Sequence, residues 1–151
     1  MIKFSLDLTP SSKRFLDSFT HLLDSALLKA SRKSAVEVEG SVKERFGKPG
    51  SPKVRSGDLR RSIKGYSKKT GDKYIAGART SKVYAPPLEF GAIIRAKTSP
   101  YLHFKIGGQW VKTKQVVIPK LPFMEPGLEE ALPKVKEIFE REVEKALEGG
   151  R

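Results

Sequence analysis

Two adjacent prolines, Pro86 and Pro87, limit what this chain can fold into, because each fixes φ and removes a backbone hydrogen-bond donor. Neither an interior strand nor the middle of a helix accommodates such a pair. Residues 83–91 are therefore expected to form a tight, packed corner, in which Gly91 provides a site for positive φ or close backbone approach. The corner lies between two strand-rich blocks, and a helical segment flanks each block.

Before the corner, apolar periodicity predicts one strand and one long helix. Residues 2–8 alternate between apolar and polar side chains, which is typical of a half-buried strand. Thr9 is expected to cap a helix whose first residue is Pro10. Apolar residues recur at helical spacing as far as Phe46, where a stretch rich in glycine and proline ends the pattern. Such a helix is about 54 Å long, so part of it should project or pack on a neighbouring subunit.

The remaining elements are predicted from turns and periodicity. Residues 62–68 and 73–79 are expected to pair as antiparallel strands around a turn at 70–72, and Gly107-Gly108 indicates a second hairpin. Residues 59–63 favour either a helical turn or the start of a strand. A final helix is expected to start at residues 123–126, with Pro126 in its first turn. The order predicts an α+β fold, with a mainly antiparallel sheet, a long N-terminal helix and a C-terminal helix packed on one face, and extended hairpin loops. Residues 1–151 are expected to form one domain, in which 47–58 and 92–115 are flexible or projecting loops.

The positive charge of the chain is concentrated in one block. The formal net charge is +13, and residues 43–82 hold 13 of the 30 Lys and Arg residues but only three of the 17 acids. Such a block suits a partner of negative potential, or it is simply a solvated, highly charged hairpin. The residues predicted to contact a partner or DNA are Lys53, Arg55, Arg61, Lys64, Lys68 and Lys69.

No combination of side chains predicts catalysis, a metal site or a cofactor. The chain has no cysteine, and its two histidines, His21 and His103, are isolated in the sequence. Glu89 is a lone acid between apolar neighbours. It is interpreted as an acceptor of backbone hydrogen bonds or an ion-pair partner, and the alternative is a general acid in a hydrolase. No apolar run is long enough to span a bilayer, so the chain is expected to be soluble and not exported.

Three short segments form motifs: residues 56–63 read S-G-D-L-R-R-S-I, residues 84–91 read Y-A-P-P-L-E-F-G, and residues 118–128 read I-P-K-L-P-F-M-E-P-G-L. In this order they resemble the elements T/S-G-x-L-R-x-S-I, Y-A-x-x-x-E-F-G and I-P-A-R-P-F-L-x-P-A-L of tailed-phage neck and tail-completion proteins. That group includes the lambda-type minor tail protein Z and the Mu-type virion morphogenesis proteins. The positions that match and are expected to be structural are Gly57, Leu59, Arg60, Ser62, Ile63, Tyr84, Ala85, Glu89, Phe90, Gly91, Pro119, Pro122, Phe123 and Pro126.

The resemblance implies a non-enzymatic virion protein at the neck or the top of the tail, present in the host cytoplasm during assembly. It implies a homo-oligomeric ring, of six copies by tail symmetry, that joins the tail to the head connector. The implied partners are head-completion, adaptor or portal-side proteins on one side, and a tail terminator or tail-tube protein on the other. DNA would pass through the lumen. A tail terminator or minor tail protein and a basic nucleic-acid-binding accessory protein remain alternatives. Within the corner, Phe90 is expected in the core and Glu89 is expected to anchor the backbone.

Overall fold

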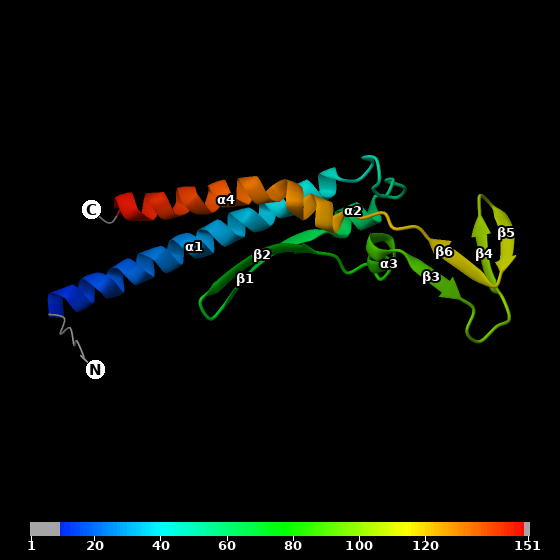
Figure 1. The fold of residues 1–151 in the computed structure, drawn as a ribbon, viewed down its shortest axis with the longest axis horizontal. Coiled ribbons are helices and arrows are strands. Elements are labelled where there is room, and N and C mark those ends of the chain that lie inside the picture. Colours follow the sequence, from blue (N-terminus) through cyan, green and yellow to red (C-terminus); the bar gives the residue numbers. More distant parts are fainter. Residues whose placement is uncertain (1–9, 150–151) are drawn as a thin grey trace, which may run out of the picture.

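The computed structural model describes residues 10–149, which form four helices and six strands (Figure 1). The predicted strand at residues 2–8 and the cap Thr9 lie outside the described residues. In chain order the elements are α1 (Pro10–Glu44), α2 (Asp58–Ser62), β1 (Lys64–Thr70), β2 (Lys73–Arg79), α3 (Ala85–Phe90), β3 (Ala92–Arg95), β4 (Leu102–Ile106), β5 (Gln109–Thr113), β6 (Gln115–Ile118) and α4 (Met124–Gly149). The α+β class is confirmed.

The helices α1 and α4 lie side by side and run antiparallel (Figure 1). The face of α1 that packs against other elements carries mostly small residues, spaced every four positions: Ala26, Ala30, Ser34, Val38 and Val42 are all buried. Short side chains at this spacing let two helix backbones approach closely. Ion pairs fix the register, with Arg45 Nη1 2.8 Å from Glu130 Oε1 and Lys33 Nζ 2.5 Å from Glu142 Oε1.

The β1–β2 hairpin packs against α1 along much of its own length. At its base, the Gly65 amide donates a 2.6 Å hydrogen bond to the Glu39 carboxylate, and a Cβ on Gly65 would lie 2.2 Å from the Ala35 carbonyl oxygen. At the other end of the hairpin, Lys69 and the Tyr74 hydroxyl both donate to Asp24. The hydrogen bond from Gly65, reinforced by Lys43, lowers the pKa of Glu39 below its ordinary value.

The strands do not join into one sheet, although a single mainly antiparallel sheet was expected. They form three separate two-stranded sheets, in which β1 pairs with β2, β3 with β6, and β4 with β5, each antiparallel. Gly107 and Gly108 connect β4 to β5, and both have positive φ. Residues 92–118, which contain β3 to β6, extend away from the helical pair and are called the arm below (Figure 1).

The main apolar cluster lies where α1, α2, α3 and the start of α4 meet. Its buried members are Val38, Val42, Leu59, Ile63, Ala85, Phe123 and Ala131. By contrast, the N-terminal part of α1 exposes its apolar side chains, and Phe15 is 64% exposed. As expected from its length, α1 projects beyond the elements that bury its centre (Figure 1).

We predict that Gly127→Ala destabilises the fold, because the new methyl group would lie 2.6 Å from the Val42 Cα where α4 crosses α1. Overpacking of this kind costs about 1–3 kcal/mol. Gly40→Ala is the matched control, since nothing lies within 4 Å of its added methyl group and alanine favours a helix over glycine. Denaturant unfolding of both variants tests the prediction, and equal stability would contradict the close helix contact.

Candidate functional site

The first motif forms the short helix α2 and links it to the end of α1. Gly57 precedes the helix with φ of 75°, a left-handed conformation that suits glycine. Leu59 is buried, and Ile63 is fully buried just after the helix ends. Arg60 Nε donates a 3.1 Å hydrogen bond to the Lys43 carbonyl, which lies in the last turn of α1. Ser62 Oγ lies 2.6 Å from Thr80 Oγ1 and so ties the motif to the chain after β2.

The second motif is the Pro-Pro corner, which forms the short helix α3. Both prolines lie in its first turn, where their missing amide donors cost nothing. Ala85 and Glu89 are four residues apart, so they share one helix face, and both are buried. Gly91 follows with φ of 77° and approaches the Ile118 carbonyl so closely that a Cβ would lie 3.3 Å from its oxygen.

The expectation that Phe90 lies in the core is wrong, because its side chain is 74% exposed. Glu89 and Phe90 are consecutive helical residues and therefore point about 100° apart around the helix axis. The face that turns inward is the one that carries Ala85 and Glu89, so Phe90 turns outward. Tyr84, which precedes the helix, is also exposed.

Glu89 accepts hydrogen bonds from three consecutive backbone amides at the start of α4. Its Oε2 lies 2.8 Å from the Phe123 nitrogen and 3.0 Å from the Met124 nitrogen, and its Oε1 lies 3.0 Å from the Glu125 nitrogen. The first amides of a helix have no intrahelical partner, and a carboxylate there also meets the positive end of the helix dipole. Glu89 is therefore a capping residue supplied to α4 by another helix, which confirms its expected role as an acceptor of backbone hydrogen bonds.

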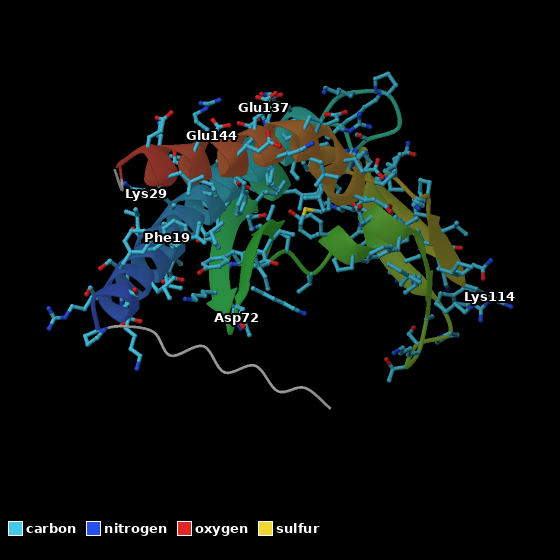
Figure 2. All side chains as sticks on the ribbon, turned by 60° about the vertical axis from the view of Figure 1, so that its left-hand side comes forward. Phe19, Lys29, Asp72, Lys114, Glu137 and Glu144 are labelled. Carbon is cyan, nitrogen blue, oxygen red and sulfur yellow. The ribbon has the colours of Figure 1, made fainter. Side chains whose placement is uncertain are left out.

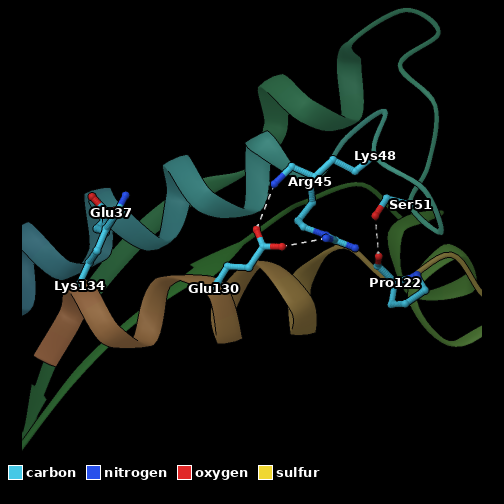
Figure 3. Close-up of polar contacts among 7 residues, drawn as sticks. All are labelled: Glu37, Arg45, Lys48, Ser51, Pro122, Glu130 and Lys134. Atoms are coloured by element: carbon cyan, nitrogen blue, oxygen red, sulfur yellow. Dashed lines mark hydrogen bonds and ion pairs between the residues drawn. The ribbon is translucent and has the colours of Figure 1, made fainter.

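The third motif leads into α4 and closes the junction. Phe123 is fully buried, with its ring centroid 5.0 Å from that of Phe46. The Leu121 amide donates a 2.8 Å hydrogen bond to the Leu88 carbonyl of the second motif. Ser51 donates to the Pro122 carbonyl at 3.2 Å and so attaches the loop after α1 to the same place (Figure 3). Pro119 is exposed, and Pro126 lies in the first turn of α4.

The three motifs therefore meet in space, and we call this contact region the motif junction. Ion pairs extend it along the helices, where Arg45 and Lys48 both reach Glu130, and Lys134 lies 2.9 Å from Glu37 (Figure 3). A groove of about 990 Å³ lies beside the junction. Its walls are the loop after α1 on one side and β6 with Tyr84 and Leu88 on the other.

The sequence did not reveal which atoms Glu89 would bind, but one signal was present. The residues before α4 are Leu121, Pro122 and Phe123, and none has a side chain that caps a helix. A helix that lacks its own cap needs an acceptor from elsewhere. The one acid in the corner was the available candidate.

All six predicted contact residues are exposed, but they do not gather into one patch. Lys53 and Arg55 lie in the loop after α1, whereas Lys64, Lys68 and Lys69 follow β1 toward the hairpin turn. Two of the six form ion pairs within the chain: Arg61 Nη2 lies 2.6 Å from Asp58, and Lys69 binds Asp24. Hydrogen bonds from Ser56 and Arg61 lower the pKa of Asp58, and those from Lys69 and Tyr74 lower the pKa of Asp24.

Both histidines are exposed and lie on different elements, His21 on α1 and His103 on β4. Between residues 10 and 149 no group of His, Asp and Glu side chains is arranged to hold a metal ion. In the same range, no helix combines the length and the apolar character needed to cross a membrane.

Comparison with known proteins gives no match: no family model, no curated protein and no solved structure is similar to this chain.

We predict that Glu89→Ala lowers the free energy of unfolding by about 3 kcal/mol, because three amides lose a charged acceptor in a buried position. Glu89→Gln should cost less, since one carbonyl oxygen remains. Glu129→Gln removes an exposed carboxylate of α4 and serves as the control. Denaturant unfolding distinguishes these variants, and a Glu89→Ala protein as stable as the control would refute the capping role.

Proposed function

We propose that this chain is a structural subunit of a tailed-phage virion, forming a ring at the neck or the top of the tail that joins the tail to the head connector. The observation that carries the proposal is the motif junction. The three segments that resemble neck and tail-completion proteins are far apart in the sequence, yet they contact one another around Glu89. Motifs that together build one structural junction support a family fold better than three unconnected short matches.

The distribution of exposed apolar surface also supports a ring subunit. The N-terminal part of α1 exposes Phe15 and Leu16, and the arm at the other end exposes Ile93, Trp110 and Val117. Large apolar side chains in contiguous exposed patches usually mark interaction surfaces. Two different patches at opposite ends suit the heterologous contacts from which cyclic rings are built.

In this proposal the ring has six copies, matching tail symmetry, and performs no catalysis. One side contacts a head-completion, adaptor or portal-side protein, and the other contacts the tail terminator or tail-tube protein, while DNA passes through the lumen. A station as tail terminator or minor tail protein remains an alternative within the proposal.

A second candidate function is nucleic-acid binding, favoured by the exposure of the basic block. Lys53, Arg55, Lys64 and Lys68 are exposed and form no ion pair within residues 10–149. Free cations of this kind neutralise phosphates without reading the base sequence.

The ring is tested by native mass spectrometry and electron microscopy of the purified chain, alone and mixed with connector and tail-tube proteins. We expect a discrete closed oligomer that binds at least one of them, and the protein should be present in purified virions. A strictly monomeric chain that binds neither protein and is absent from virions would refute the proposal.

Nucleic-acid binding is tested by filter binding to duplex DNA across a series of salt concentrations. We expect log K to fall linearly with log salt, and each phosphate contact removed should reduce the slope by about one. A variant that combines Lys53→Gln, Arg55→Gln, Lys64→Gln and Lys68→Gln should flatten the line, whereas Lys136→Gln on α4 should change little. A wild-type affinity that does not depend on salt would reject this second function.

A further inference from the structure

The arm carries only positive charge. Residues 92–118 include Arg95, Lys97, Lys105, Lys112 and Lys114, and the nearest acids in the sequence are Glu89 and Glu125 on either side. None of these five cations forms an ion pair within the part of the chain that the structure describes. Electrostatically, the arm is therefore an unsatisfied surface.

One face of the β4–β5 hairpin combines these cations with exposed aromatic side chains. Lys105 pairs across the strands with Trp110, and the two side chains share a face, with the Lys105 Nζ 4.9 Å from the indole ring centre. Lys112 lies 4.4 Å from the centre of the Tyr101 ring. Trp110 is 72% exposed. In protein interfaces, large aromatic side chains flanked by cations are frequent sites of strong binding.

The β3–β6 part of the arm adds an aliphatic surface. Ile93 and Val117 lie directly opposite each other in the register, so they share one face, and both are more than half exposed. Arg95 lies two residues beyond Ile93 and therefore on the same face. The arm thus presents apolar and positive groups together along its length, and no element among residues 10–149 covers this face.

The helix α4 shows the opposite charge. It contains eight Glu residues and four Lys or Arg residues. Glu130 and Glu142 pair with α1, but Glu137, Glu140, Glu144 and Glu148 follow helical spacing along an exposed stripe. Of these four, only Glu140 has an ion-pair partner among the described residues, Lys136 at 3.7 Å. Leu132 and Leu147 add exposed apolar surface to the helix.

These two surfaces do not meet within one chain. The free end of α4 and the arm extend in opposite directions from the motif junction (Figure 1). Figure 2 shows Lys114 on the arm at one end and Glu137 and Glu144 on α4 toward the other. Within one copy the core separates these complementary charges, and a second copy can bring an arm and an acidic stripe together.

We infer that the arm of one copy docks on the exposed acidic stripe of α4 of a second copy, with Lys105, Lys112 and Lys114 facing Glu137, Glu140 and Glu144 and with Trp110 packed on the exposed leucines. The inference rests on the proposed ring subunit and specifies its contact. The two surfaces differ, so the contact is heterologous and repeats from copy to copy until the ring closes.

Charge reversal tests this contact. One variant carries Lys105→Glu, Lys112→Glu and Lys114→Glu, and the other carries Glu137→Lys, Glu140→Lys and Glu144→Lys. All six residues are exposed, so circular dichroism should show native folding. Each variant alone should associate at least about tenfold more weakly than the wild type in analytical ultracentrifugation. A matched control with Arg32→Glu, Lys73→Glu and Arg79→Glu changes the net charge equally at exposed positions outside the arm and should associate normally.

Mixing the two variants is the decisive measurement, because each then offers a surface complementary to the other. We expect the mixture to recover association, with the two chains alternating. Normal assembly of either variant alone, failure of the mixture to recover, or a wild-type chain that remains monomeric would each overturn the inference. A ring that forms despite arm reversal leaves the proposed function standing. Arm-dependent oligomers that bind no tail or connector protein support the inference and refute that function.

Discussion

The structure depends on one carboxylate that serves a helix other than its own. Glu89 belongs to α3, yet it accepts hydrogen bonds from the first amides of α4. Burial of a charged group is costly, and here three donors and the helix dipole offset that cost. The position of these amides sets where α4 begins and places Phe123 in the core beside Leu59, Ile63 and Ala85. From this starting point α4 runs antiparallel along α1, so the packing of the two helices depends on the corner that holds Glu89.

Sequence reasoning succeeded where the determinants are local. The segment from Pro10 onward is helical as expected, Pro86 and Pro87 lie neither in a strand nor in the middle of a helix, and residues 73–79 form β2 with the predicted bounds. It failed where the outcome depends on distant partners. The strands form three sheets because the arm leaves the body after α3, and alternation along a strand does not say which strand pairs with which. Phe90 is exposed because Glu89 occupies the inward face, and its partners lie 34 to 36 residues away.

The contrast between local determinants and contacts of distant residues also explains how much of the candidate site could be predicted from the sequence. The residues of the three motifs were identified from the sequence, but their meeting around the start of α4 is a tertiary fact. The basic block was visible in the composition, and the predicted loop and strand already divided it, whereas the ion pairs of Arg61 and Lys69 were not foreseen. The sequence did not predict that the positive arm and the acidic stripe of α4 lie toward opposite ends of the molecule, because only the fold places them there (Figure 2).

The main apolar cluster lies at the motif junction, away from the arm and the first turns of α1. Selection for folding and selection for binding therefore act on different parts of the chain. Substitutions among the buried residues of the junction alter whether the chain folds. Substitutions on the arm or on the first turns of α1 touch few buried groups and alter mainly what the folded chain fits against. Surface and core can therefore diverge at different rates. Under the proposed ring function, related chains with different neighbours are expected to keep the junction and exchange the ends, so that one framework would serve many assemblies.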